Sequence, residues 1–209
     1  MNDLATTVFV VDDELSVRQA LVRLLRFARL NVAAFSSAEA FLECYDPGTP
    51  GCLVLDLAMP GLNGLELQEA LTGRGSSLPI IFLTGHGDLP SGVMAMKRGA
   101  VDFLTKPADA NDLIETVRGA IEKDRVTRQT RAELTEIQRR FATLTPREHE
   151  VLCQVVCGKL NKQIAADLGT TEKTIKVHRA RVMEKAKVGS LAELVMLAQR
   201  ARILPCQPT

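Results

Sequence analysis

The stretch VFVVDDE at residues 8–14 decides the fold class, because three similar stretches follow it along the chain. They are CLVLD at 52–56, IIFLT at 80–84 and VDFLTKP at 101–107. In each, a short apolar run that is typical of a buried strand ends directly in a polar residue. Apolar runs without alternation predict the two-sided burial of a parallel sheet. Because ligands bind at the carboxyl ends of strands in such sheets, we expect these polar residues to converge at one site.

Strands and helices alternate over roughly the first 120 residues, which predicts an α/β fold with a parallel five-stranded sheet covered on both faces. Apolar positions in the helical segments recur on one face. The predicted strands are Val8–Val11, Asn31–Phe35, Cys52–Leu55, Ile80–Leu83 and Val101–Leu104. The predicted helices are Ser16–Ala28, Ala38–Tyr45, Gly64–Leu71, Ser91–Arg98 and one that begins at Asp109.

The rest of the chain is predicted to be entirely helical. Residues 123–140 are polar and free of Gly and Pro, so we expect the fifth helix to continue through them as a linker. A solvated helix and a rigid lever or dimer seam both suit this composition. The predicted helices beyond it are capped by Thr145 (with Glu148 closing a capping box), by Asn161, by Thr170 or Thr171, and by Ser190. Short helices around a tight glycine-containing turn form the helix-turn-helix pattern.

Charge is divided unevenly between the two halves. Residues 1–122 carry 16 Asp/Glu and 9 Lys/Arg, a net charge of −7, whereas residues 123–209 carry 9 and 17, a net charge of +8. This asymmetry indicates an acidic module joined to a module that binds nucleic acid or membrane. Because the chain has no run of 18 or more apolar residues, we expect no membrane-spanning helix.

The five cysteines (Cys44, Cys52, Cys153, Cys157 and Cys206) are odd in number and form no metal-binding pattern. The spacing of Cys153 and Cys157 suits a metal clip or a redox pair, but no second ligand pair stands nearby, so we favour buried or half-buried thiols. The N-terminus also lacks the basic and apolar regions of a secretory signal. These features lead us to expect a reducing, cytoplasmic location.

Three carboxylates, one hydroxyl and one ammonium group would meet at the predicted sheet edge, from Asp12, Asp13, Asp56, Thr84 and Lys106. Neighbouring carboxylates repel one another, so a hard cation such as Mg²⁺ or Mn²⁺ is needed to keep them ionised. A carboxylate beside a metal and a lysine can act as a nucleophile toward a phosphoryl group. The sequence therefore predicts phosphoryl transfer.

The segments VVDDE (10–14), LDLAMPGLNG (55–64), LTGHGD (83–88) and FLTKP (103–107) resemble the receiver domain of two-component response regulators. This resemblance implies a flavodoxin-like (βα)5 fold with Asp56 as the phosphoacceptor. It also implies a cis peptide bond between Lys106 and Pro107 that aims the lysine. The implied metal ligands are Asp12, Asp13, Asp56 and the backbone carbonyl of Ala58, and the implied switch residues are Thr84 and Phe103.

The sequence TPREHEVLCQVVCGKLNKQIAADLGTTEKTIKVHRARVMEKAKVGSLAELV at 145–195 resembles the LuxR-type helix-turn-helix module, and the whole chain resembles the FixJ subfamily of the FixJ/NarL response regulators. Basic side chains on the helix at 171–186 can reach phosphates and bases in the major groove. The resemblance favours Lys176 and Val177 as base-reading residues, whereas Ala180 occupies a position that is often basic in the family. The expected DNA contacts are Asn161, Lys162, Lys173, Thr174, Lys176, Val177, His178, Arg181 and Lys185.

We therefore expect a receiver domain at residues 1–122, a helical linker at 123–140 and a LuxR-type four-helix DNA-binding domain at 141–209. A sensor histidine kinase would phosphorylate Asp56. The homodimer would then bind double-stranded promoter DNA and, with RNA polymerase, activate transcription. We expect no enzyme activity beyond the chain's own phosphorylation and dephosphorylation.

Two alternatives remain at this point. The first is a signalling protein that acts through protein contacts and whose helix-turn-helix module has lost DNA binding. The second is a metal-dependent phosphatase or phosphotransferase acting on outside substrates, which would need a positioned general acid or base. His86 is the candidate for that role in the first half of the chain.

Overall fold

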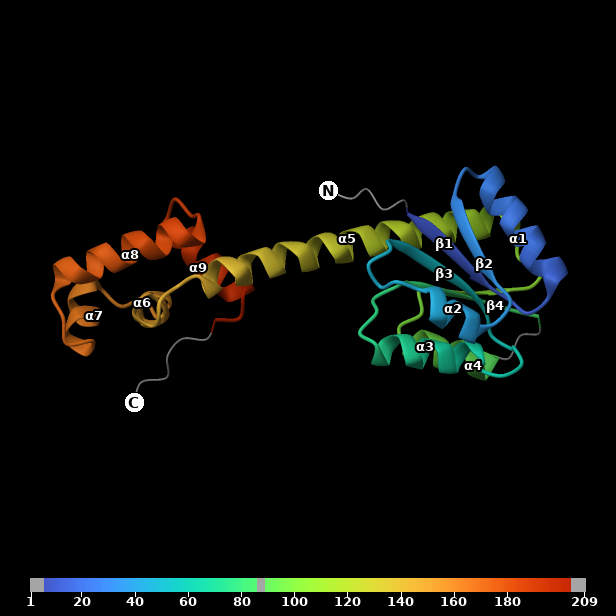
Figure 1. Ribbon diagram of the computed structural model, residues 1–209, viewed down its shortest axis with the longest axis horizontal. Coiled ribbons are helices and arrows are strands. Elements are labelled where there is room, and N and C mark those ends of the chain that lie inside the picture. The colour runs from blue at the N-terminus through green and yellow to red at the C-terminus, as the bar shows by residue number, and fades with distance from the viewer. Residues whose placement is uncertain (1–5, 86–88, 204–209) are drawn as a thin grey trace. The chain divides into compact units, whose positions relative to one another are not determined.

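The computed structural model describes residues 6–85 and 89–203, and the chain divides into two compact units after Arg128. The first unit contains a five-stranded parallel sheet with helices on both faces, and the second contains helices (Figure 1). In the described part of the chain, no helix combines the length and the apolar character that crossing a membrane requires.

The sheet has the strand order β2-β1-β3-β4-β5, with every neighbouring pair parallel, which confirms the flavodoxin-like prediction. Its strands are β1 (Thr7–Val11), β2 (Asn31–Phe35), β3 (Gly51–Asp56), β4 (Ile80–Thr84) and β5 (Asp102–Thr105). The order reverses at β1, which lies between β2 and β3. Such a switch point opens a crevice at the carboxyl ends of the two central strands. Val11 is in register with Leu55, so Asp12 and Asp56 emerge side by side there.

Helices bury both faces of this sheet, and alternate residues of each strand enter different cores. Val8 and Val10 pack in a core shared with α1 and α5, whereas Phe9 and Val11 pack in a core shared with α2, α3 and α4. This two-sided burial explains the continuous apolar runs in the sequence. The helices are α1 (Leu15–Phe27), α2 (Ala38–Cys44), α3 (Gly64–Gly73), α4 (Leu89–Lys97) and α5 (Ala110–Ala142).

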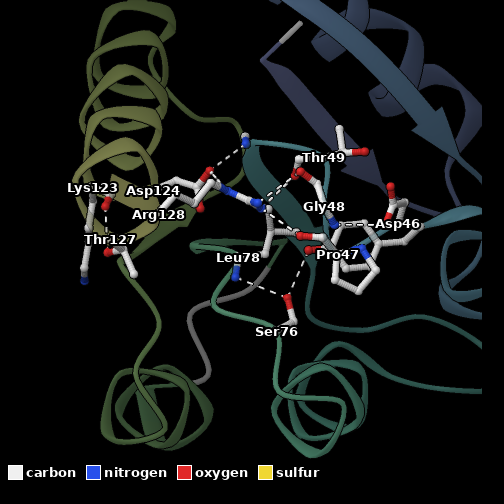
Figure 2. Close-up of polar contacts among 12 residues, drawn as sticks. Asp46, Pro47, Gly48, Thr49, Ser76, Leu78, Lys123, Asp124, Thr127 and Arg128 are labelled. Carbon is white, nitrogen blue, oxygen red and sulfur yellow. Dashed lines mark hydrogen bonds and ion pairs between the residues drawn. The ribbon is translucent and has the colours of Figure 1, made fainter. Parts of the chain in front are cut away.

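The predicted continuation of the fifth helix beyond residue 122 is confirmed. The first turns of this continuation are bound to the first unit. Asp124 is 1% exposed, and its Oδ2 accepts hydrogen bonds from the Gly51 backbone N–H at 2.9 Å and from Arg128 Nε at 2.7 Å. The Arg128 guanidinium also donates to the carbonyls of residues 47–49 at 2.8–3.1 Å (Figure 2). These bonds explain why the first unit extends to Arg128, past the predicted boundary at residue 122.

The second unit follows the helix-turn-helix pattern, with α6 (Pro146–Val156), α7 (Asn161–Asp167), α8 (Glu172–Ala186) and α9 (Leu191–Arg200) after the end of α5. The predicted caps Thr145, Thr171 and Ser190 each accept a backbone N–H, and Glu148 closes the capping box. The core includes Leu152, Ile164, Ile175, Val182 and Leu194.

One cap was predicted wrongly. Leu160 is the N-cap of α7, and Asn161 is its first helical residue. The side chain of Gln163 accepts the Leu160 N–H at 2.8 Å, while the Asn161 side chain instead accepts a hydrogen bond from Arg179.

The cysteines fit the predicted buried or half-buried environment only in part. Cys52 and Cys153 lie in the two units' cores, and burial raises the pKa of Cys52 to about 12. Cys44 and Cys157 are exposed, so the prediction is wrong for them, and Cys206 lies outside the described residues.

Candidate functional site

Three carboxylates gather at the carboxyl edge of the sheet. Asp12 and Asp13 follow β1, and Asp56 is the last residue of β3. Each offers an oxygen atom, and these atoms all lie within 4.8 Å of one another. Asp12 and Asp56 are buried, whereas Asp13 is exposed to solvent. The structure thus brings together the carboxylates that the strand ends predicted.

Lys106 lies against the two buried carboxylates. Its Nζ is 2.6 Å from Asp12 Oδ2 and 3.0 Å from Asp56 Oδ2, and its side chain is 14% exposed. The Lys106 backbone N–H donates to the Thr84 carbonyl at 2.6 Å, which joins the loop after β5 to the end of β4. The peptide bond between Lys106 and Pro107 is cis, as the resemblance implied.

Burial and charge act in opposite directions on these groups. Burial raises the pKa of Asp12, and the nearby charge of Asp56 adds to this effect, while the hydrogen bond from Lys106 opposes it. Burial by itself would lower the pKa of Lys106, but its hydrogen bonds and charge interactions with Asp12 and Asp56 outweigh burial and raise it. The ammonium group therefore stays charged at neutral pH, where it faces more than one carboxylate.

Arg18 is a site residue that the sequence reasoning missed. Its Nη1 donates to the backbone carbonyls of Asp12 at 2.6 Å and of Asp13 at 3.1 Å. The Glu14 N–H also donates to Asp12 Oδ1 at 2.9 Å. Together these bonds fix the loop that carries the two carboxylates. The sequence feature that could have identified Arg18 is its position in the first turns of the helix that follows the Asp pair.

The donor set fits a hard divalent cation, because such cations prefer carboxylate and carbonyl oxygens. Asp12, Asp13 and Asp56 supply carboxylates. Ala58 is exposed, and its N–H donates to Asp56 Oδ1 at 3.4 Å. The assignment of its carbonyl as a ligand stays a prediction.

The two predicted switch residues lie on neighbouring strands. Thr84 is buried at the end of β4, where it is in register with Thr105 of β5. Phe103 of β5 packs against Gly92 of α4, since a Cβ added to Gly92 would lie 3.0–3.1 Å from three ring atoms. Their role in switching stays a prediction. His86, the candidate acid or base of the alternative hydrolase, lies outside the described residues.

The predicted DNA-contacting residues lie on α7 and α8, most of them with exposed side chains. Val177 is an exposed apolar residue among basic neighbours. The Nζ atom of Lys176 lies 3.6 Å from Oε1 of Glu172. The Nδ1 atom of His178 is buried without a hydrogen-bond partner in the described part of the chain. Exposed members are Lys162, Lys173, Lys176, Val177 and Arg181, and half-buried members are Asn161, Thr174, His178 and Lys185.

Lys185 differs from the other predicted contacts because its ammonium group is engaged inside the helical unit. It donates to Glu148 Oε2 at 2.6 Å and to the Thr143 carbonyl at 3.1 Å. Glu148 is 2% exposed and also closes the cap at Thr145. This geometry gives Lys185 a structural role, and its predicted contact with DNA stays a prediction.

The carboxylate of Glu148 should titrate at unusually low pH. The hydrogen bond from Lys185, followed by that from the Thr145 N–H, lowers its pKa from the usual 4.5 to about 2. Because the folded value lies below the unfolded one, the stabilisation is complete above about pH 4.5 and is lost as the pH falls toward 2. We expect an NMR titration of the carboxyl carbon to show this midpoint, and Lys185→Met to raise it.

Stability measurements provide a second check on the same pair. Glu148→Gln should be less stable than wild type at neutral pH, and the difference should shrink as the pH falls below about 4.5. A wild-type midpoint near 4.5 would contradict the internal pairing of Glu148 with Lys185.

Comparisons with known proteins agree with both units. The family described as "Response regulator receiver domain" matches residues 8–118, and that described as "Bacterial regulatory proteins, luxR family" matches residues 142–198. Nodulation protein W of Bradyrhizobium diazoefficiens is 45% identical over 192 residues, which cover 92% of this chain and 85% of that protein. Transcriptional regulatory protein FixJ of Azorhizobium caulinodans is 43% identical over 198 residues, which cover 95% of this chain and 94% of that protein.

A solved structure adds to this agreement. The response regulator StyR has a TM-score of 0.86 and 46% identity, and the match covers 94% of this chain and 99% of that one. The resemblance read from the sequence is thereby confirmed. The chain belongs to the two-component response regulators of the FixJ/NarL type, in which a receiver domain is joined to a LuxR-type DNA-binding domain that regulates transcription.

Proposed function

We propose that this response regulator is switched by phosphorylation of Asp56, which a sensor histidine kinase supplies. The observation that carries the proposal is the Lys106 ammonium group, which bridges Asp12 and Asp56 beside a cluster of three carboxylates. A lysine so placed can neutralise a phosphoryl group that arrives on the neighbouring carboxylate.

The residues of the site support in-line transfer from a phosphohistidine. A carboxylate oxygen of Asp56 attacks the phosphorus, the bond between phosphorus and the histidine nitrogen breaks, and the histidine leaves with that electron pair. Lys106 stabilises the charge on the transferred oxygens, and the Thr84 hydroxyl donates to one of them. A Mg²⁺ or Mn²⁺ ion held by Asp12, Asp13, Asp56 and the Ala58 carbonyl would neutralise further charge on the same oxygens.

The switch then acts through α4 and β5. We infer that Thr84 and Phe103 rearrange on phosphorylation and that two receivers pair through this face. The exposed apolar side chains Val93, Met94 and Met96 on α4 support an interface of this kind, because they leave an apolar surface open to a partner.

The output is binding of promoter DNA by the paired helix-turn-helix modules, with activation of transcription through RNA polymerase. The exposed Lys173, Lys176 and Arg181 support the DNA contact. We further propose that the protein acts in the cytoplasm. It would catalyse only its own phosphorylation and dephosphorylation, with no turnover of outside substrates.

The test treats the full chain with acetyl phosphate and Mg²⁺ and compares wild type with Asp56→Asn by intact mass and by oligomeric state. We expect a phosphoryl adduct and a dimer in wild type alone, because the amide of the variant is a poor nucleophile. An adduct that persists in Asp56→Asn would place the phosphoacceptor elsewhere. If wild type gains no adduct although Mg²⁺ binds, control by partner contacts would replace the phosphorylation switch.

A further inference from the structure

A hydrogen bond links the two helices of the helix-turn-helix motif at the surface expected to face DNA. Arg179 of α8 donates through Nη1 to Oδ1 of Asn161, the first residue of α7. Both side chains are half-buried, whereas the neighbouring Lys162 and Lys176 are exposed. We propose that Arg179 is a positioning residue for DNA binding, which holds the Asn161 amide so that its NH₂ group donates to a backbone phosphate. This inference rests on the proposed phosphate contact of Asn161.

The chemistry of the pair determines which end of the amide stays available. A guanidinium group has only donors, so it selects the carbonyl oxygen of Asn161. The Nδ2 group, with its two N–H donors, then forms the other end of the side chain. A phosphate oxygen only accepts hydrogen bonds, so this orientation suits phosphate, whereas the flipped amide would present an oxygen to it.

The Asn161 side chain is not used for capping, which leaves it available for this role. Asparagine near a helix start commonly caps the helix, but here Leu160 is the N-cap and the Gln163 side chain accepts its N–H. No salt bridge to Arg179 or Lys162 occurs in the described part of the chain. The Arg179 guanidinium therefore binds Asn161 without competition from a carboxylate, and its positive charge lies beside the Asn161 amide.

The proposal predicts that Arg179 acts through Asn161. Asn161→Ala should weaken DNA binding about tenfold to a hundredfold, because one hydrogen bond to a charged group is lost. Arg179→Met should weaken binding roughly threefold to tenfold when Asn161 is present, and should cause little further loss when it is absent. Asn161→Asp retains an acceptor for Arg179 but lacks the NH₂ group, so it should bind at least as weakly as Asn161→Ala.

The experiment measures binding of the full chain, treated with acetyl phosphate and Mg²⁺, to a fluorescently labelled mixed-sequence DNA duplex over a range of NaCl concentrations. Lys173→Met serves as the control for a charged phosphate contact. The slope of its log binding constant against log NaCl concentration should be smaller in magnitude than that of wild type by about 0.9. Asn161→Ala and Arg179→Met should lower the affinity with little change in slope, because a neutral amide releases no counterion and the Arg179 guanidinium binds Asn161 in place of a phosphate. Circular dichroism checks that each variant is folded, and Arg179→Ala, which also lacks a side-chain donor, replaces Arg179→Met if that variant is unfolded.

The outcomes separate the two proposals. If wild type does not bind DNA, or if Asn161→Ala binds like wild type, the proposed DNA contact fails. If Asn161→Ala weakens binding but Arg179→Met does not, or if their effects simply add, the positioning role fails. A slope that falls by about 0.9 in Arg179→Met would show that the arginine itself neutralises a phosphate, which also overturns the positioning role.

Discussion

Arg128→Met is expected to destabilise the receiver unit by about 3–5 kcal/mol, because the buried carboxylate of Asp124 loses its cation. Asp124 is 1% exposed, and Arg128 Nε lies 2.7 Å from its Oδ2 (Figure 2). The same substitution removes the hydrogen bonds to the carbonyls of residues 47–49. Urea unfolding of the full chain, followed by tyrosine fluorescence, provides the measurement. The chain has one tyrosine and no tryptophan, and Tyr45 directly precedes the loop that Arg128 holds.

The same helix supplies a matched control. Arg125 pairs with Glu122 at 2.7 Å, but these side chains are 63% and 59% exposed. Solvent weakens such a pair, so Arg125→Met should change the stability little. Adding Asp124→Asn to Arg128→Met should recover part of the loss, because the uncompensated buried charge disappears. Equal stability of Arg125→Met and Arg128→Met would contradict the importance of the buried pair.

The buried pair also connects the linker helix to the strand that carries the phosphoacceptor. Asp124 accepts the N–H of Gly51, which begins β3, and Asp56 ends the same strand. A Cβ on Gly51 would lie 1.8 Å from the Thr7 carbonyl oxygen, so only glycine fits at the residue where Asp124 binds the strand. The first turns beyond the predicted receiver boundary are therefore part of the receiver's own structure.

Local signals in the sequence were sufficient to predict the sheet and the acidic cluster. Each apolar run became a strand, and the polar residues that follow, such as Asp12 and Asp56, meet because parallel strands end at one edge. Helix boundaries were predicted less accurately. The fourth helix begins at Leu89, before the predicted Ser91, because Pro90 is tolerated in a first turn. Asp109 proved to precede the fifth helix, where its carboxylate accepts the N–H groups of Asn111 and Asp112.

Contacts between distant residues could not be predicted in the same way. The pairing of Lys185 with Glu148 and that of Arg179 with Asn161 depend on how helices pack, and neither periodicity nor spacing specifies which cation meets which oxygen. The sequence pattern placed Lys185 on a basic helix but did not reveal its pairing with Glu148, because exposed and internally paired side chains look alike in a helical pattern. The misassigned cap at Asn161 has a related cause, since the Asn161 side chain accepts a hydrogen bond from Arg179 of α8, and the helix begins one residue earlier, at the Leu160 N-cap.

Gly64→Ala is expected to impair both the stability and the phosphorylation of the receiver. Gly64 begins α3, and an added Cβ would lie 2.5 Å from the backbone oxygen of Asp56 and 3.1 Å from Leu57 Cα. These are backbone atoms, so relief requires a shift of the chain at the phosphoacceptor itself. We expect a loss of about 1–3 kcal/mol in unfolding free energy from overpacking. We also expect acetyl phosphate to label Asp56 roughly tenfold to a hundredfold more slowly, because small displacements of reacting groups are costly.

Gly73→Ala, at the other end of α3, separates this local clash from a general effect of replacing glycine. An added Cβ at Gly73 meets nothing within 4 Å, so we expect unchanged labelling and a gain of about 0.4–1 kcal/mol in stability from the less flexible unfolded chain. The two alanine variants should therefore change stability in opposite directions, and only Gly64→Ala should slow phosphorylation. Labelling of Gly64→Ala at the wild-type rate would show that the end of β3 can move without displacing the Asp56 carboxylate. The close approach of Gly64 would then serve packing alone.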